Sequence, residues 1–210
     1  MKFKGIIFDL DGVICFTDKY HYKAWKALAD KLGIYFDEKI NDRLRGVSRM
    51  ASLDIILERS DKKYSEEDKL RFAEEKNDIY RNLLAEMSPN DISAEVREIL
   101  TKLKEKGLKL AIGSSSKNTP LILAKTDTAK YFDAVSDGNN ITHSKPNPEV
   151  FLKAAEFLGL KSKDCLVVED AFSGIDAGVA GGFKTAGIGP ASKYPKTNYL
   201  LNSFSDLLKI

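Results

Sequence analysis

Residues 3–12 have the sequence FKGIIFDLDG, in which a short apolar run at residues 3–8 is followed by two acidic residues and a glycine. A short, continuous apolar run of this kind is typical of a β-strand that is buried on both faces. Asp9 and Asp11 are two positions apart, so their side chains start on the same face of the chain, and Gly12 lets the backbone turn. We therefore expect a buried first strand that ends in a pair of carboxylates.

Similar apolar runs recur further along the chain, with helical patterns between them. The runs lie at residues 108–112, 166–168 and 183–188. One helix is predicted over residues 93–106, and another is predicted to begin with Asn147 as N-cap and Pro148 as its first residue. Strands that alternate with helices at this spacing predict right-handed βαβ units. The expected fold class is α/β, with a doubly wound parallel sheet.

The segment from Thr17 to about Ser88 departs from this alternation. A βαβ crossover needs only about a dozen residues, whereas roughly a hundred separate the first two expected strands. The insert is helical in pattern, and its last helix, predicted over residues 66–86, has these apolar residues assigned to its inward face: Leu70, Ala73, Ile79, Leu83 and Leu84. We expect a helical cap domain at 17–88 and an α/β catalytic core made of 1–16 and 89–210.

The composition narrows the class of protein. Lys and Arg (33) nearly balance Asp and Glu (31), and a net charge of +2 gives no electrostatic footprint for nucleic acid or an anionic membrane. No apolar stretch approaches the roughly 18 residues of a transmembrane helix. Cys15 and Cys165 form neither a CxxC nor a zinc spacing, which fits a reducing compartment. We expect a cytoplasmic monomer that acts on a small molecule.

Residues that can carry chemistry stand at the ends of the expected strands. Ligands on an open α/β sheet bind beyond the carboxyl ends of its strands, so we expect these residues on one rim. Four crowded carboxylates would raise one another's pKa values unless a cation lay among them. Hard oxygen ligands without His or Cys favour Mg²⁺. The residues on this rim are Asp9 and Asp11, then Ser114, Ser115 and Ser116, then Lys145 with Pro146, and finally Glu169 and Asp170.

This set of residues suits phosphoryl transfer. Mg²⁺ and Lys145 would neutralise a phosphoryl group enough for the anionic Asp9 to attack it. Ser114 can donate to a phosphate oxygen, and Asp11 can exchange a proton with the leaving oxygen. The acceleration of phosphate-monoester hydrolysis can approach ~10²¹. No single residue could supply this acceleration, but a site that combines a nucleophile, a metal, a cationic clamp and an acid could.

In their order along the chain, these residues resemble the four motifs of the haloacid dehalogenase-type phosphotransferase superfamily. The helical insert directly after the first motif resembles the subclass I cap of that superfamily. The chain is most similar to the β-phosphoglucomutase family within it, and the resemblance covers essentially the whole chain. The further residues that carry it are Thr17, His21, residues 25–29, residues 46–49, Ser52, residues 116–118 and residues 144–146.

The resemblance implies a role for each matching residue. Asp9 would be phosphorylated, and Asp11 would be the general acid/base, with Thr17 and His21 beside it. Mg²⁺ would be held by Asp9, the Asp11 carbonyl and Asp170, with Glu169 assisting. The remaining phosphate and substrate ligands would be Ser114, Ser115, Lys145, Arg45, Gly46 and Ser52.

The implied reaction interconverts β-glucose 1-phosphate and glucose 6-phosphate through a bound glucose 1,6-bisphosphate. Such a mutase must hold a second phosphate far from Asp9, and the guanidinium fork of an arginine suits phosphate well. The candidate residues for that second site are Arg49, Ser116, Lys117 and Asn118.

Three positions depart from the family's usual pattern, and they bear on substrate and mutase efficiency. Arg45 stands where many members have Lys, Cys15-Phe16 replaces more polar residues, and Ser115 replaces a commoner Ala.

Other interpretations of the chain stay open. The first is a Mg²⁺-dependent phosphatase of the same fold that acts on a sugar phosphate or another small metabolite, with water attacking the aspartyl-phosphate. A phospho-acceptor switch domain would need no cap, and a C–halogen hydrolase would need neither Asp11 nor Mg²⁺.

Overall fold

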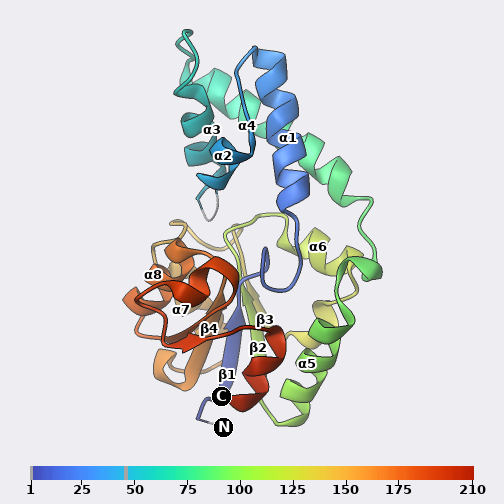
Figure 1. The fold of residues 1–210 in the computed structure, drawn as a ribbon, viewed down its shortest axis with the longest axis vertical. Helices are drawn as coiled ribbons and strands as arrows, with labels where there is room; N and C mark the ends of the chain where they lie inside the picture. Colours follow the sequence, from blue (N-terminus) through green and yellow to red (C-terminus); the bar gives the residue numbers. More distant parts are fainter. Residues whose placement is uncertain (1, 45–46) are drawn as a thin grey trace. The chain divides into compact units, whose positions relative to one another are not determined.

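The computed structural model describes residues 2–44 and 47–210. The chain forms two compact units (Figure 1). One unit joins Met1–Phe16 to Met87–Ile210, and the other is Thr17–Glu86. None of the helices in the described ranges combines the length and the apolar character that a membrane crossing requires.

The first unit is built on a parallel sheet with the strand order β3-β2-β1-β4-β5-β6. In Figure 1, α7 and α8 lie on one side of the sheet, and α5 and α6 lie on the other. This arrangement confirms the predicted α/β fold. The strands are β1 (Gly5–Phe8), β2 (Lys109–Gly113), β3 (Ala134–Ser136), β4 (Cys165–Glu169), β5 (Lys184–Gly187) and β6 (Tyr199–Leu200), and the helices are α5 (Ala94–Glu105), α6 (Thr119–Lys125), α7 (Glu149–Phe157) and α8 (Phe172–Ala180).

Strand β1 occupies the centre of the sheet, between β2 and β4. All of its residues are buried, as expected for a parallel strand that is covered on both faces. Phe8 is paired with Ile112 of β2 and with Val168 of β4. The chain therefore leaves these neighbouring strands at the same edge of the sheet, where Asp9 and Glu169 are the next residues.

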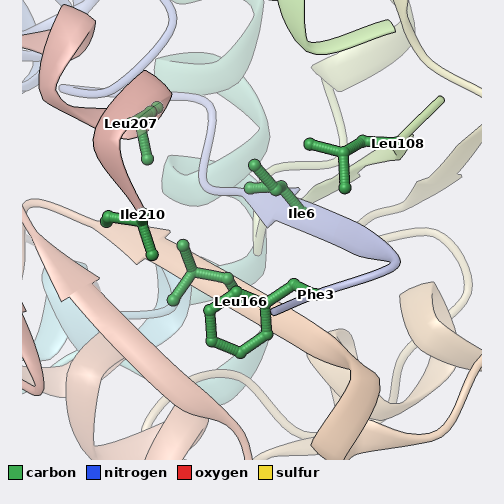
Figure 2. A pocket seen from close by; sticks show the side chains of 6 residues that line it. All are labelled: Phe3, Ile6, Leu108, Leu166, Leu207 and Ile210. Carbon is green, nitrogen blue, oxygen red and sulfur yellow. The ribbon is translucent and has the colours of Figure 1, made fainter. Parts of the chain in front are cut away.

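The opposite end of the sheet is closed by apolar side chains. Figure 2 shows Phe3 and Ile6 close to Leu207 and Ile210, which belong to the C-terminal segment of the chain. The pocket between these side chains and their apolar neighbours has a volume of about 10 Å³. A space of this size holds at most one water molecule, and its lining offers no polar partner for one. This end of the sheet is therefore a closely packed apolar region.

The second unit is helical. It consists of α1 (Asp18–Leu32), α2 (Glu38–Asp42), α3 (Arg49–Leu57) and α4 (Glu66–Leu84). Helix α1 ends at Gly33, which adopts the left-handed conformation with φ 72°. Helix α4 begins with a capping box between Ser65 and Asp68. The inward faces of these helices share one apolar cluster, which includes Trp25, Leu53 and Phe72.

The structure corrects two expectations about helices. Leu70 was assigned to the inward face of α4 but is 56% exposed, because the buried side of that helix runs through Phe72, Lys76 and Tyr80. Helix α7 begins one residue later than predicted, with Pro148 rather than Asn147 at the N-cap position. The side chain of Asn147 still accepts a hydrogen bond from the Glu149 amide at 3.0 Å.

Two strands were not predicted at all. Strand β3 has three residues and β6 has two, so neither offers a long enough apolar run to be recognised. Their positions outside β2 and β5 nevertheless complete the sheet.

The two faces of the helical unit predict different responses to truncation of a leucine. Leu53→Ala opens a cavity in the apolar cluster and should destabilise the protein by about 2–5 kcal/mol. Leu70→Ala removes an exposed side chain and should change stability by no more than about 0.5 kcal/mol. Urea unfolding followed by far-UV circular dichroism measures both variants, and equal losses would contradict this account of the buried face.

Candidate active site

Asp9 lies in the first position after β1, and its backbone fixes it there. Its amide donates to the Val168 carbonyl at 2.9 Å, which extends the pairing of β1 with β4 by one residue. The Asp9 side chain is buried. Asp11 is half-buried in the tight loop that follows, where the Gly12 amide donates to the Cys15 carbonyl at 2.7 Å. The two predicted catalytic carboxylates therefore stand at the carboxyl end of the central strand.

Lys145 joins two carboxylates in the interior of this unit. Its Nζ lies 2.6 Å from Asp9 Oδ1 and 2.6 Å from Glu169 Oε1. The same ammonium lies over the Phe151 ring, 4.7 Å from its centroid. Burial by itself would lower the pKa of Lys145, but the charges of Asp9 and Glu169 outweigh it and hold the pKa above its usual value. Lys145 is therefore a fixed positive charge next to Asp9.

Glu169 is the most deeply buried carboxylate of the site. Its Oε2 accepts hydrogen bonds from the amides of Asp170 and Ala171, each at 3.0 Å. Burial raises the pKa of Glu169 to about 7, the charge of Asp9 adds to this rise, and Lys145 opposes it. A carboxylate in this position needs positive charge close to it in order to stay ionised near neutral pH.

Three carboxylates converge closely enough to share a cation. Asp9, Glu169 and Asp170 each offer an oxygen, and these atoms lie within 4.8 Å of one another. All the donors are hard oxygens, which is the set that Mg²⁺ prefers. The Asp11 carboxylate is not part of this group. The expected contribution of the Asp11 backbone carbonyl stays a prediction.

Two glycines leave room for these acidic side chains. A Cβ atom on Gly12 would lie 2.1 Å from Asp170 Oδ2, and one on Gly174 would lie 1.9 Å from Glu169 Oε1. Gly12 also has φ 87°, a conformation that favours glycine. The space around the carboxylates is therefore set by the absence of side chains at both positions, and the acidic group fits the oxygen cradle that Mg²⁺ requires.

The loop after β2 brings the predicted phosphate-binding serines to the same edge of the sheet. Ser114 is buried, and its amide donates to the Ser136 carbonyl of β3 at 3.0 Å. Its hydroxyl accepts from the Ser116 amide, and the Ser116 hydroxyl accepts from the Asn118 amide, both at 3.2 Å. The buried Ser115 hydroxyl has no hydrogen-bond partner among the described residues. This loop is held in shape by its own serines.

Lys117, in the same loop, is exposed, and the helical unit contains the other predicted site residues. Thr17 and Ser52 are buried, and Arg49 is the half-buried first residue of α3. Arg49 donates to Asn77 Oδ1 of α4 at 2.8 Å. Arg45 and Gly46 lie outside the described residues, so their predicted roles are unchanged. Trp25 is buried in the apolar cluster of the unit.

His21 has a partner that the sequence did not reveal. Its Nδ1 lies 3.0 Å from Nζ of Lys76, and its ring stacks on Tyr80 with a centroid distance of 4.0 Å. A lysine ammonium can only donate, so Nδ1 accepts and the imidazole proton is on Nε2. Burial lowers the pKa of His21 well below its usual value, and the charges of Lys76 and Arg49 lower it further. His21 is therefore held neutral.

Two more residues of functional interest were missed. Lys76 is buried on α4, where its Nζ lies 4.6 Å from the ring centroids of both Trp25 and Tyr80. Its position on the buried stripe of that helix was the available signal.

Glu149 accepts hydrogen bonds from the amides of Thr142 and His143 at 3.0 and 2.8 Å, and so anchors the loop that carries Lys145. An acidic residue in the first turn of a helix gave no hint of this role.

Comparisons with known proteins match most of the chain. A sequence model of the haloacid dehalogenase-like hydrolase family matches residues 3–182. A β-phosphoglucomutase from Bacillus subtilis (strain 168) is 36% identical over 206 residues, which cover 97% of this chain and 91% of the relative. A phosphorylated carbohydrates phosphatase from Thermotoga maritima is 32% identical over 184 residues, which cover 86% of this chain and 82% of the relative.

The solved structures agree with the sequence comparison. A crystal structure of β-phosphoglucomutase from Clostridium difficile has a TM-score of 0.91 and 41% sequence identity, and the match covers 98% of this chain and 93% of that one. The similarity therefore extends over the helical unit as well as the α/β unit. It confirms the resemblance that the motifs suggested.

The anchoring role of Glu149 predicts a pH dependence of stability. Hydrogen bonds from the amides of His143 and Thr142 lower the pKa of Glu149 to about 2 from a usual value of 4.5. The stabilisation is therefore fully present above about pH 4.5 and is lost as the pH falls towards 2. Glu149→Gln should lower stability at pH 7 and should remove this part of the acid destabilisation, as measured by urea unfolding from pH 7 to pH 2. Glu156→Gln, at an exposed position of the same helix, should leave both unchanged.

The contact between Lys76 and His21 predicts a titration shift. Lys76→Met keeps an apolar chain between the Trp25 and Tyr80 rings but removes the positive charge, so the pKa of His21 should rise. It should stay below the usual value of about 6.5, because burial and Arg49 remain. An NMR titration of the two histidines measures this, with the exposed His143 as the internal reference. A His21 pKa that does not move would contradict the contact.

Proposed function

The chain belongs to the haloacid dehalogenase-like hydrolase family, and on that premise we propose that it is a phosphotransferase mutase that interconverts β-glucose 1-phosphate and glucose 6-phosphate. The observation that carries this proposal is the buried contact of Lys145 with Asp9 and Glu169, next to Asp170. The choice of a mutase is supported by the β-phosphoglucomutases that match both units at 36% and 41% identity.

The first step is nucleophilic attack by Asp9. A carboxylate oxygen of Asp9 forms a bond to phosphorus while the bond from phosphorus to the sugar oxygen breaks. Lys145 favours this step, because its ammonium lies 2.6 Å from Asp9 Oδ1 and its positive charge can offset the negative charge of the phosphoryl group. Asp11 supplies the proton that the leaving sugar oxygen requires. The products of the step are an aspartyl-phosphate and a sugar hydroxyl.

The second step reverses the first with another hydroxyl of the sugar. Asp11 accepts the proton of that hydroxyl, whose oxygen bonds to phosphorus while the bond to Asp9 breaks. With β-glucose 1-phosphate, phosphorylated Asp9 first transfers its phosphoryl group to the 6-hydroxyl, which forms glucose 1,6-bisphosphate; Asp9 then takes the phosphoryl group from the 1-oxygen, which leaves glucose 6-phosphate. The bisphosphate is therefore also the compound that can phosphorylate Asp9 at the start.

The acidic group supports a requirement for Mg²⁺. Asp9, Glu169 and Asp170 would hold the ion, together with the backbone carbonyl of Asp11. Bound Mg²⁺ would neutralise negative charge on the phosphoryl group. Ser114 and Ser115 would donate hydrogen bonds to the same group, and the Ser115 hydroxyl has no competing hydrogen-bond partner among the described residues.

The helical unit and the loop after β2 are assigned to the sugar and its second phosphate. Thr17 and His21 would support proton exchange at Asp11, and a neutral His21 suits such a role. The proposed ligands of the sugar and the second phosphate are Arg45, Gly46, Arg49, Ser52, Ser116, Lys117 and Asn118. An intermediate held in this way must be kept from water, because hydrolysis of the aspartyl-phosphate would end the cycle.

A phosphatase that acts on a sugar phosphate is the second candidate. It is favoured by the 32% identity to a phosphorylated carbohydrates phosphatase from Thermotoga maritima. The chemistry of Asp9 would be the same, but water would attack the aspartyl-phosphate. The two candidates therefore differ in product and not in the first step.

One incubation tests the proposal. The protein is mixed with β-glucose 1-phosphate, Mg²⁺ and a trace of glucose 1,6-bisphosphate, and glucose 6-phosphate and free phosphate are followed in the same sample. We expect rapid formation of glucose 6-phosphate with little free phosphate. Activity should fall by at least about 10³-fold in Asp9→Asn, which lacks the anionic nucleophile, and should be lost in EDTA and restored by added Mg²⁺.

The products decide between the candidates. Free phosphate as the main product would make the protein a phosphatase. Full activity in Asp9→Asn would overturn the assignment of the nucleophile, and full activity in EDTA would overturn the role of the metal. Unfolding curves of Asp9→Asn show whether the loss of activity reflects chemistry, because a folded and inactive variant is the expected result.

A further inference from the structure

The loop after β3 braces the loop after β2. The Gly138 amide donates to the Ser116 carbonyl at 3.3 Å. Gly138 also has no room for a side chain, because a Cβ atom there would lie 2.5 Å from the Ser115 carbonyl oxygen and 2.9 Å from the Lys117 amide nitrogen. Residues 137–140, which we call the brace loop, are therefore packed against the backbone of residues 115–117. Nothing in the sequence pattern had pointed to them.

Asn139 is the brace-loop residue whose side chain contacts the loop after β2. Its Nδ2 donates to the Lys117 carbonyl at 3.0 Å and to Asp137 Oδ2 at 3.2 Å. The Asn139 amide also donates to Asp137 Oδ1 at 2.8 Å, and Asp137 is buried. Both hydrogens of the carboxamide are therefore used, one to fix the side chain on Asp137 and the other to hold the neighbouring loop.

The carbonyl that Asn139 holds belongs to a functional segment. A peptide group is planar, so fixing the Lys117 oxygen also fixes the plane that contains the Asn118 amide. That amide donates to the Ser116 hydroxyl at 3.2 Å, and Asn118 is buried. One hydrogen bond from Asn139 therefore acts on the orientation of the whole 116–118 segment.

We propose that Asn139 is a positioning residue that holds residues 116–118 in the shape that binds the second phosphate of the substrate. This inference rests on the proposed function only in assigning that segment to the second phosphate. Asn139 acts through the Lys117 carbonyl and does not touch the substrate. Its loss should weaken the handling of substrates with two phosphates and should spare the reaction of a substrate that has only the phosphate transferred to Asp9.

Asn140 provides a matched control. Its side-chain Oδ1 accepts from the Ser136 hydroxyl at 3.0 Å and from the Asp137 amide at 3.3 Å, and its carbonyl accepts from Lys153. These contacts stay within the brace loop and its own supports. Asn140→Ala therefore removes a carboxamide of the same size from the next residue without removing a bond to residues 116–118.

The test compares two reactions in the same set of variants. One is the release of glucose monophosphate from glucose 1,6-bisphosphate, and the other is the hydrolysis of acetyl phosphate, which has a single phosphate. Asn139→Ala should lower kcat/KM for the bisphosphate about tenfold, mainly through a higher KM, and should change kcat/KM for acetyl phosphate by less than about twofold. Asn140→Ala should change both values by less than about twofold.

A second variant separates the effect of the hydrogen bond to Lys117 from the effect of side-chain size. Asn139→Asp keeps the shape of the side chain but cannot donate to the Lys117 carbonyl, and it places a carboxylate beside Asp137. It should lower kcat/KM for the bisphosphate at least as much as Asn139→Ala does. The melting temperatures of all variants are measured alongside, so that a global loss of fold is recognised by equal losses in both reactions.

Several results would overturn the inference. They are equal effects of Asn139→Ala and Asn140→Ala, parallel losses in both reactions, or a failure of the unsubstituted protein to react with the bisphosphate while it hydrolyses acetyl phosphate. The proposed mutase is judged separately, by formation of glucose 6-phosphate from β-glucose 1-phosphate. Because bisphosphate consumption occurs in a phosphatase as well as in a mutase, the two hypotheses can fail independently.

Discussion

A buried ammonium between two buried carboxylates is the interaction on which the α/β unit's site depends. Lys145 contacts Asp9 and Glu169 at 2.6 Å each, and all three side chains are removed from water. A buried charge is costly unless it is paired, so each member of this group requires the others. The group also ties three elements together, because Asp9 follows β1, Glu169 ends β4, and Lys145 precedes α7. Any shift of one element is opposed by the electrostatics of the other two.

The same constraint explains why small residues surround the acidic group. Glu169 accepts hydrogen bonds from Lys145 on one oxygen and from the amides of Asp170 and Ala171 on the other. It cannot move aside for a neighbour, so Gly174 must lack a side chain, and Gly12 must do the same for Asp170. Polar contacts decide the positions of the carboxylates, and glycines provide the space that those positions need. The predicted chemistry thus depends on residues that have no reactive group.

The features that could be predicted from the sequence were those set by local pattern. Short, continuous apolar runs marked β1, β2, β4 and β5, and parallel strands place their ends on one edge, so Asp9, Ser114 and Glu169 were expected there. The contacts between elements were not predictable in the same way. Lys76 stood on the buried stripe of α4 without any sign of its partner, and Asn139 followed a strand too short to show a period. Their partners, His21 and Lys117, are far away in the sequence, so only the folded chain reveals them.

The central place of β1 in the sheet means that this strand is made long before all of its partners are available. Asp9 and Lys145 are 136 positions apart in the chain. At about 5–20 residues per second, a ribosome takes on the order of ten seconds to reach the lysine after the aspartate has been added. The helical unit is one continuous segment, Thr17–Glu86, so all of its residues have been added long before β4 is made. Strand β1 lies between β2 and β4, so the sheet cannot cover its apolar side chains on both sides until β4 has been made, and they need protection from aggregation during that interval.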